Sequence, residues 1–312
     1  QGQVVALYNY MSQILVELIK LANLIITITK ALACAGRIES VFEVKSGMSD
    51  GDVKNVDAKE ETPSVEFKNV SLTYSGSGAP SVEGINFKAM KGQTIGVIGG
   101  TGSGKSSLVN LIPRLYDATQ GEVIVDGVNV KEYDIETLRN KVGIVMQKAV
   151  LFKGTIRENM WMGKKGATDE QIDEALEISQ SKEFVDSKEG RLDYPIEQGG
   201  KNLSGGQRQR LTIARAIVRK PDVLILDDSA SALDFATDAA LRKAIRGMNN
   251  SPTVFIVSQR AASLMYADFI IVLDDGQVAG MGTHDELLAN CEVYKEIYES
   301  QFKKADSEGG VA

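Results

Sequence analysis

Residues 99–106 have the sequence Gly-Gly-Thr-Gly-Ser-Gly-Lys-Ser, between an apolar, strand-like stretch at 94–98 and a helix-forming stretch that begins at Lys105. This G-x-x-x-x-G-K-S pattern is typical of a phosphate-binding loop, because backbone N–H groups of the turn surround the phosphates and the helix N-terminus adds partial positive charge. Lys105 is expected to reach the β- and γ-phosphates, and the Ser106 hydroxyl to ligate Mg²⁺. The alternative is a glycine-rich structural turn. The candidate nucleotide-binding residues here are Gly99, Gly100, Thr101, Gly102, Ser103, Gly104, Lys105, Ser106 and Ser107.

A second apolar run, 223–226, ends in two adjacent carboxylates, Asp227 and Asp228. Carboxylates at the end of a buried strand are costly unless a cation or hydrogen bonds meet them. Asp227 is therefore expected to hold Mg²⁺, directly or through water, and the alternative is a helix-capping aspartate.

Composition narrows the class of protein. Of the 312 residues, 43% are apolar and 25% charged, which is typical of a folded globular chain rather than a disordered one. The net charge of −7 disfavours a nucleic-acid partner, which requires a basic face. Cys34 and Cys291 lack metal-like spacing and are expected to be reduced thiols in a cytosolic setting.

The N-terminal segment, 4–35, is mostly apolar, but its polar residues recur every three or four positions and so share one helix stripe. It lacks the features of a signal peptide, and the N-terminus is expected to be a cut within a longer protein. The segment is either a membrane helix with a polar stripe toward a cavity or other helices, or a long amphipathic cytosolic helix. Glu17 and Lys20 are spaced to pair with each other. The stripe contains Asn9, Gln13, Glu17, Lys20, Asn23, Thr27 and Lys30.

The rest of the chain has the pattern of an α/β domain. Few apolar side chains occur in 45–62, which is a linker by composition, and a polar tail follows Lys303. Between them, buried apolar runs alternate with helical stretches, which predicts a largely parallel sheet covered on both faces. The expected strands are 65–67, 85–87, 94–98, 142–146, 223–226 and 254–257.

Residues 203–210 have the sequence LSGGQRQR. Ser204 and Gln207 form the pattern of a capping box that opens a helix over 208–220, which Pro221 ends. A capped helix start with two glycines also offers open N–H groups to an anion. LSGGQ shortly before an acidic strand is the signature of ATP-binding cassette (ABC) proteins, and the chain resembles this family over nearly its whole length.

The resemblance implies a P-loop NTPase ABC cassette of α/β class, with a mostly parallel core sheet, an antiparallel β subdomain and an α-helical signature subdomain. Residues 1–44 resemble the last transmembrane helix of a half-transporter exporter with its cytoplasmic extension, which favours the membrane interpretation. The implied domains are 1–44, the linker 45–62, the cassette 63–303 and a flexible tail 304–312. The segment 151–159 (LFKGTIREN) and Glu197 resemble exporter segments, in contrast to importers and soluble cassettes.

The resemblance also implies roles for individual residues. Tyr74 matches the aromatic residue that stacks on adenine, and Gln147 the glutamine between the nucleotide and the membrane domain. In this family two cassettes meet head to tail, so each ATP lies between one chain's phosphate loop and the other's signature. The implied Mg²⁺ ligands are Ser106, Gln147 and Asp227. The implied contacts to a partner's ATP are Leu203, Ser204, Gly205, Gly206 and Gln207, and the interface-crossing D-loop is Ser231, Ala232, Leu233 and Asp234.

Two catalytic positions depart from the family pattern. Asp228 stands where the family has a glutamate that activates water, so its carboxylate lies about 1.5 Å further back. Gln259 stands where the family has a switch histidine; an amide can donate a hydrogen bond but cannot carry positive charge. The single histidine, His284, lies in a C-terminal segment where the family often has a structural one. The candidate catalytic residues are therefore Asp228, Gln147 and Gln259.

These features predict an ATP-binding and ATP-hydrolysing subunit of an ABC exporter, using ATP and Mg²⁺ at a degenerate site of its own. The expected partners are a second half-transporter that supplies the glutamate and histidine, the subunit's other transmembrane helices, membrane lipid and an exported substrate. The expected location is the plasma or inner membrane, with the cassette in the cytoplasm. The alternatives are a regulatory ATP-binding module with little hydrolysis, and a soluble cassette ATPase.

Overall fold

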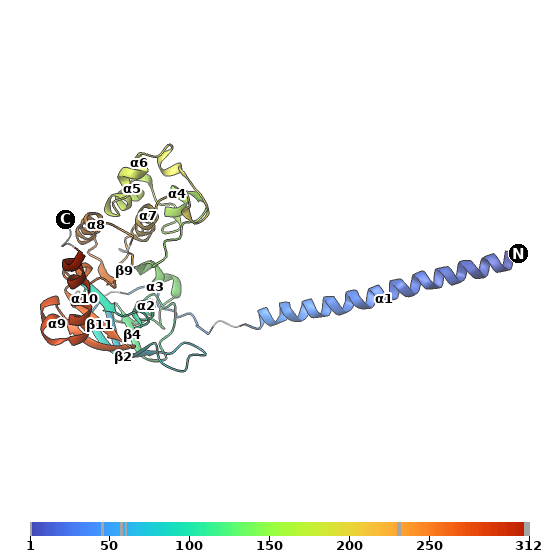
Figure 1. The fold of residues 1–312 in the computed structure, drawn as a ribbon, viewed down its shortest axis with the longest axis horizontal. Coiled ribbons are helices and arrows are strands. Elements are labelled where there is room, and N and C mark those ends of the chain that lie inside the picture. The colour runs from blue at the N-terminus through green and yellow to red at the C-terminus, as the bar shows by residue number, and fades with distance from the viewer. Residues whose placement is uncertain (1, 45–46, 57–58, 60, 230–231, 309–312) are drawn as a thin grey trace. The chain divides into compact units, whose positions relative to one another are not determined.

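The computed structural model describes residues 2–44, 47–56, 59, 61–229 and 232–308, and it divides into one compact unit that ends at Ser49 and another that begins at Asp50 (Figure 1). The remaining positions, including parts of the expected linker and Ser231, lie outside the described residues, as do tail residues 309–312. Each unit is considered by itself.

The first unit is dominated by α1 (Gly2–Phe42), a helix of 41 residues with no buried side chain. Among the described residues it is the one helix that is long and apolar enough to cross a membrane, by length and composition. At about 1.5 Å per residue it extends for roughly 60 Å, about twice the hydrocarbon core of a bilayer. The expected pair forms, with Lys20 Nζ 2.8 Å from Glu17 Oε1.

The second unit is built on a six-stranded sheet in the order β12-β11-β3-β10-β9-β6. Its first five strands along the chain pair in parallel, and only β12 runs antiparallel, against β11. The strands are β3 (Thr94–Gly99), β6 (Val142–Val145), β9 (Val223–Asp227), β10 (Thr253–Val257), β11 (Phe269–Asp274) and β12 (Gln277–Gly282). The largely parallel sheet predicted from the apolar runs is therefore present.

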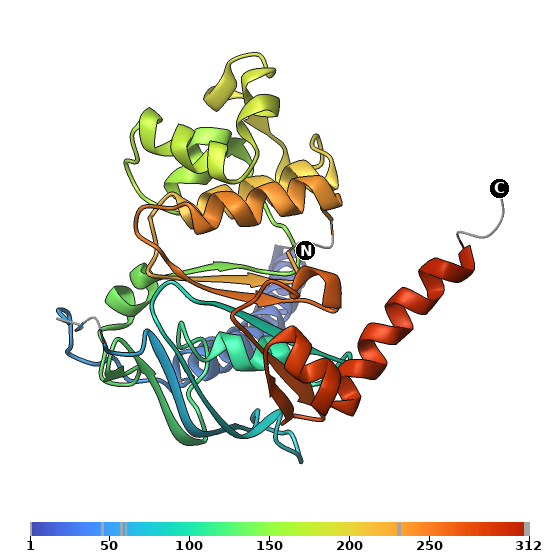
Figure 2. The same ribbon diagram turned by 90° about the vertical axis from the view of Figure 1, so that its left-hand side faces the viewer.

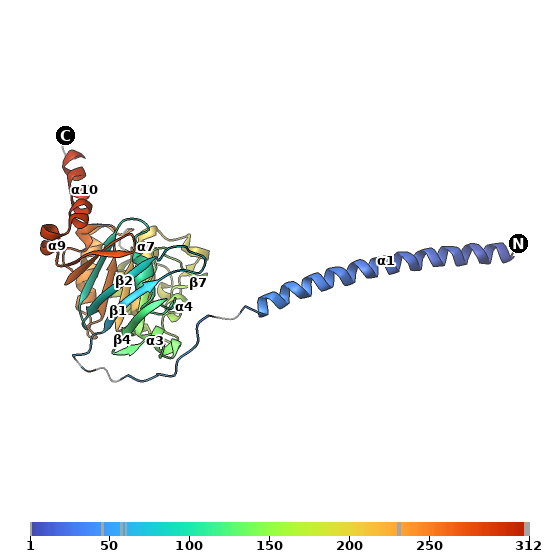
Figure 3. The same cartoon turned by 90° about the horizontal axis from the view of Figure 1, so that it is seen from below.

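Alternate residues of β9, β10 and β11 face two different cores, which is why these strands are almost entirely apolar. In β9, Leu224 and Leu226 belong to the core under the helices, whereas Val223 and Ile225 belong to the core under a second, antiparallel sheet. That sheet has the order β2-β1-β4-β5 and is visible in Figure 3. It consists of β1 (Val65–Leu72), β2 (Val82–Ala89), β4 (Gln120–Val125) and β5 (Val128–Asn129).

The helices divide between the two sides of the core sheet. Figure 2 shows the helices of residues 156–246 on one side, and α2 with the antiparallel strands on the other. The former side holds α4 (Ile156–Trp161), α5 (Asp169–Ile178), α6 (Lys182–Asp186), α7 (Gly205–Ile217) and α8 (Phe235–Arg246), with the strand pair β7 (Gly154–Thr155) and β8 (Pro195–Ile196). The remaining helices are α2 (Lys105–Asn110), α3 (Ile135–Lys141), α9 (His284–Asn290) and α10 (Glu292–Glu308), and the short 3-10 turns are η1 (Arg191–Asp193), η2 (Gln198–Gly200) and η3 (Ala261–Ser263).

Part of the compositional linker is bound to the cassette. Val53 N–H donates to Glu132 O at 3.0 Å, and Asp134 N–H donates to Val53 O at 3.0 Å. The Asp50 carboxylate also accepts a hydrogen bond from Ile135 N–H, at the start of α3. Backbone pairing of this kind leaves little trace in composition, so the polar sequence gave no signal for it.

Two helix ends differ from the sequence expectation. The helix that follows the signature ends at Ile217 rather than 220, and Lys220, which precedes Pro221, has a left-handed φ of 54°. At the C-terminus, α10 continues to Glu308, so the backbone of 304–308 in the expected tail is helical. Both cysteines are free.

Candidate nucleotide-binding site

The phosphate loop joins the end of β3 to the start of α2. A Cβ on Gly99 would lie 2.2 Å from Leu273 O, and one on Gly104 would lie 2.3 Å from Ser81 O. Gly104 also has φ 93°, a left-handed conformation that favours glycine. The packing of the loop against its neighbours therefore requires glycine at both positions.

Lys105 holds its own loop together. Its Nζ donates to Gly99 O at 2.9 Å and to Gly100 O at 2.5 Å. Burial lowers the pKa of Lys105, while the charges of Asp227 and Asp228 raise it. A lysine in this position carries its charge to the loop interior, where phosphate oxygens can replace the carbonyls as partners.

The Mg²⁺ ligands expected from the sequence come together in part. Asp227 ends β9 and is 5% exposed, and the Ser106 hydroxyl donates a hydrogen bond to its carboxylate. Burial raises the pKa of Asp227, against the lowering influence of the Ser106 bond and of Lys105. A hydroxyl, a carboxylate and an amide oxygen from Gln147 are the hard oxygen ligands that Mg²⁺ prefers, so these residues fit the ion.

Asp228 follows the strand and turns back toward β10. It has φ 46°, which aspartate tolerates better than most residues, and its N–H donates to Val257 O at 2.9 Å. Gln147 Nε2 donates to Asp228 Oδ2 at 3.3 Å. The two predicted catalytic side chains are thus in contact.

These groups line one cavity of about 270 Å³. It combines the phosphate loop with the ends of β9 and β10, where ligands bind in open α/β sheets. The lining residues are Ser81, Thr101, Gly102, Gly104, Lys105, Ser106, Ser107, Gln147, Asp227, Asp228, Val257, Ser258 and Gln259. Both substituted positions, Asp228 and Gln259, therefore face the same space as the phosphate loop.

Tyr74 lies beside this loop without lining the cavity. Its hydroxyl and the Ser107 hydroxyl are 3.0 Å apart, and its ring packs edge-on against Tyr116 with centroids 4.9 Å apart. Tyr116, which the sequence did not single out, is 44% exposed and steadies the Tyr74 ring. The aromatic residue expected for adenine is thus fixed to the start of α2.

The signature residues lie apart from the cavity, at the start of α7. The capping box forms as predicted, with Gln207 N–H donating to Ser204 Oγ at 3.3 Å and Ser204 N–H to Gln207 Oε1 at 3.1 Å. Ser204 and Gly205 are exposed and Leu203 is buried. A Cβ on Gly206 would lie 3.2 Å from Ala232 O, so the signature adjoins the described part of the D-loop. The D-loop residue Asp234 caps α8, accepting from Thr237 N–H at 2.8 Å.

Gln301, a residue that the sequence did not single out, bonds the backbone around Gln259, at the expected switch position. Gln301 of α10 donates from Nε2 to Gln259 O at 2.7 Å and accepts from Ala261 N–H at 2.9 Å. A side-chain amide that bonds a carbonyl and an N–H two residues apart fixes that backbone in place. A single glutamine on a polar helix gave no signal of this contact. His284, in contrast, bonds Tyr294, with 2.7 Å between Nδ1 and Oη, and is not among the lining residues.

The exporter-like segment 151–159 forms an ordered corner. Asn159 is buried and bonds both the N–H and the C=O of Phe152 at 2.9 Å. This leaves the Phe152 ring 51% exposed, near the Arg215 guanidinium. Two hollows of about 350 and 320 Å³ include Phe152 and Arg215 in their walls. Glu197 is exposed, and its N–H donates to Asn202 Oδ1.

Comparison with known families and proteins agrees with this geometry. Residues 82–231 match the family described as ABC transporter. An uncharacterized ABC transporter ATP-binding protein of Bacillus subtilis is 40% identical over 309 residues, covering 98% of this chain and 53% of that protein. One of Mycobacterium tuberculosis is 38% identical over 99% of this chain and 53% of its own length.

A Staphylococcus aureus protein, named as a candidate multidrug export ATP-binding/permease protein, is 35% identical over 85% of this chain and 45% of its own length. Among solved structures, a bacterial Atm1-family ABC exporter with ATP bound is similar with a TM-score of 0.79 and 30% identity, covering 88% of this chain and 48% of that one. The chain spans about half the length of the curated relatives it matches.

Proposed function

The chain carries the ATP-binding cassette of the ABC transporter family, and we propose that it is the energy-converting part of an exporter subunit that uses ATP and Mg²⁺ to move a substrate across a membrane. The observation that carries this proposal is the single cavity in which the phosphate loop, Asp227, Asp228 and Gln147 come together. The names of the similar proteins, an exporter and a candidate multidrug permease, support the direction of transport.

The remaining transmembrane helices are proposed to bind beside Phe152. This region exposes Met146, Phe152 and Met162, which are 47%, 51% and 51% exposed, around the two hollows. Exposed apolar groups gathered around hollows are typical of protein–protein contacts. Gln147 follows Met146 directly, so a shift of the membrane part here reaches the Asp228 carboxylate through one side chain. With α1 in the plasma or inner membrane, the cassette lies in the cytoplasm.

At its own site the chain is proposed to bind ATP firmly and to hydrolyse it slowly. Mg²⁺, when bound, neutralises charge on the β- and γ-phosphate oxygens. Loop N–H groups and Lys105 hold the phosphates, and Ser106, Asp227 and Gln147 supply the metal's oxygen ligands. Asp228 is then left to orient the attacking water and accept its proton, from a position about 1.5 Å short of a glutamate. Gln259 can donate to the γ-phosphate without adding positive charge.

A heterodimer follows from this asymmetry. The exposed signature of this chain would complete the site of a partner that has the glutamate and histidine, whereas this chain's own site would serve mainly to bind. The proposed subunit differs from a purely regulatory module in one respect. The ATP held by the partner is still hydrolysed, at a site that Ser204–Gln207 of this chain complete. It differs from a soluble cassette in its α1 helix, and membrane fractionation tests that alternative directly.

The test is a gain of function. The Asp228→Glu/Gln259→His double variant, paired with itself, should hydrolyse ATP about 100-fold faster than the unmodified chain, because positioning errors near 1 Å can cost about that factor. Adding Lys105→Ala to the double variant should abolish the gain, which assigns the turnover to this loop. Because a glutamate is more strained than an aspartate at φ 46°, thermal unfolding is measured alongside. Fast turnover by the unmodified chain alone would contradict the degenerate site.

A further inference from the structure

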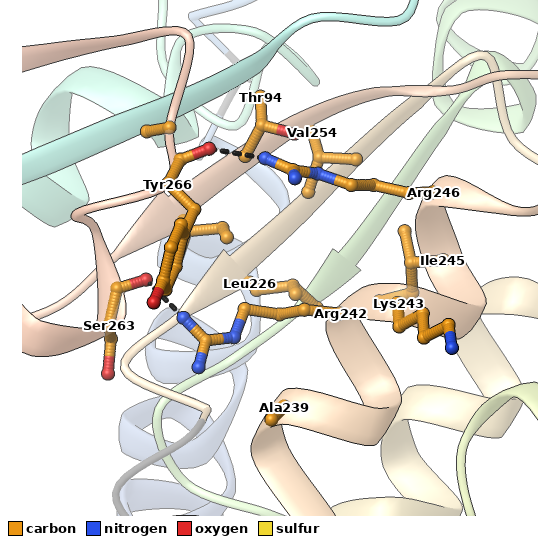
Figure 4. A pocket seen from close by; sticks show the side chains of 12 residues that line it. Thr94, Leu226, Ala239, Arg242, Lys243, Ile245, Arg246, Val254, Ser263 and Tyr266 are labelled. Atoms are coloured by element: carbon orange, nitrogen blue, oxygen red, sulfur yellow. Dashed lines mark hydrogen bonds between the residues drawn. The ribbon is translucent and has the colours of Figure 1, made fainter. Parts of the chain in front are cut away.

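A separate cavity of about 390 Å³ lies between α8 and the strands of the core sheet. None of its lining residues lines the ATP cavity. In Figure 4, Leu226 on β9 lies at its back, α8 forms one wall, and the Tyr266 ring stands at the opposite wall. A molecule could therefore bind here without displacing ATP.

The interior of this cavity is apolar. Its walls include Leu226, Ile245, Val254 and Ile256, which are 4%, 2%, 5% and 7% exposed. An apolar cavity of roughly 150 Å³ is already large enough to bind benzene, and small-molecule sites begin near 300 Å³. An apolar ligand in this hollow would supply contacts that the buried side chains of its lining lack.

The rim of the cavity is basic. Arg242 and Arg246 reach from α8 to the opposite wall, where they donate to the carbonyls of Ser263, at 2.7 Å, and of Tyr266 (Figure 4). Asp238 pairs with Arg242 at 2.9 Å, but neither Arg246 nor Lys243 has an acidic partner among the described residues. Each guanidinium has five N–H donors, so donors remain for an anion.

We propose that this cavity binds an amphiphilic carboxylate of medium chain length, with the hydrocarbon inside and the carboxylate at the basic rim. Arginine is suited to this role because its planar fork matches a carboxylate. The charge of the rim, not the apolar interior, selects an acid over a neutral or cationic amphiphile. The inference does not depend on the ATP-binding proposal and is tested without nucleotide.

Decanoate is the probe. The full chain is held in an amphipol, and unfolding is followed by the fluorescence of Trp161, its single tryptophan. The unfolding midpoint should rise in a saturable way, by roughly 5 °C at 100 times the Kd. Decanol and decyltrimethylammonium should give much smaller shifts. Equal shifts from all three amphiphiles would overturn the proposed carboxylate selectivity.

Two matched pairs of variants locate the site. Ala239→Phe fills the cavity, and its control Ala240→Phe makes the same change at a neighbouring position of α8 that does not line it. Lys243→Glu reverses a rim charge, and its control Lys165→Glu reverses an exposed charge in the turn between α4 and α5. Decanoate affinity should fall at least tenfold in the first member of each pair and stay unchanged in the second. Equal affinity within both pairs would overturn the site, and the charge pair decides the matter if Ala239→Phe does not fold.

Discussion

The phosphate loop and the signature are both glycine-containing helix starts, but they differ in what surrounds them. The loop before α2 shares a cavity with Lys105 and the carboxylates of Asp227 and Asp228, which are the groups proposed to hold phosphate and metal. The start of α7 has a capping box and does not line that cavity, and its Ser204 and Gly205 are exposed. Under the proposed function, the first helix start belongs to a site whose ligands this chain supplies, whereas the second contributes half of a site that a second chain completes.

Lys105→Ala should have the largest effect, because it breaks the complete site. Loss of a charged donor that faces two phosphates should weaken ATP binding by about 100-fold or more, since hydrogen bonds to charged groups each contribute about 1.5–3 kcal/mol. Equilibrium binding of a fluorescent ATP analogue measures this. Lys148→Ala, an exposed lysine one residue after Gln147, is the control and should bind normally. Normal ATP binding by Lys105→Ala would mean that the loop is not part of the ATP-binding site.

Ser204→Ala tests the half-site. It should destabilise the chain by about 1 kcal/mol through the lost cap, leave ATP binding at the chain's own loop unchanged, and lower turnover about tenfold in the self-paired Asp228→Glu/Gln259→His background. Thr168→Ala is a matched control, because Thr168 and Gln171 form the same capping box on α5. Thr168→Ala should lose as much stability as Ser204→Ala but should not lower the rate of ATP turnover. Equal losses of turnover would mean that the signature acts only as a cap.

The sequence predicted both helix starts, but not the distant contacts of the cassette. Both motifs are local, so spacing alone placed Lys105 at a strand-to-helix junction and Ser204 at a helix cap, and the apolar runs predicted the parallel sheet. What the sequence missed depends on distant parts of the chain that meet only on folding. Gln301 meets Gln259 across 42 positions, and Val53 pairs with backbone of 132–134 through N–H and C=O groups that every residue has.

Gln301→Glu tests whether the contact between Gln301 of α10 and the backbone of Gln259 supports the phosphate-loop site. The carboxylate keeps an acceptor for Ala261 N–H but places an oxygen against Gln259 O, so the switch backbone should shift. In the Asp228→Glu/Gln259→His background, kcat should fall about two- to tenfold with little change in KM, as expected for loss of one or two hydrogen bonds. Gln301→Ala should give a smaller loss, and Ser300→Ala none. A change in KM alone would indicate that α10 affects binding and not the switch.

Asp238→Asn gives the smallest expected effect. Asp238 lies on α8, the helix that follows the D-loop, and the D-loop adjoins the signature. Burial raises the pKa of Asp238, against the lowering influence of Arg242 and Arg260. The folded-state pKa of Asp238 is above its unfolded value, so folding favours the protonated carboxyl. The stability that this protonation contributes is fully present below the unfolded pKa, about 4. It is lost as pH rises through the folded pKa. Asparagine, an uncharged isostere of aspartate, keeps this stability at every pH.

Asp238→Asn should therefore unfold about 2 °C above the unmodified chain at pH 8, with a narrower difference at pH 5. Thermal unfolding of both proteins without nucleotide measures the two differences, and Asp274→Asn, an exposed carboxyl on β11, should show neither. A lower midpoint for Asp238→Asn at pH 8 would mean that the ion pair with Arg242 outweighs the burial of the charge. The expected gain would instead mean that the chain retains the Asp238 carboxylate at some loss of stability, under the electrostatic influence of Arg242 and Arg260.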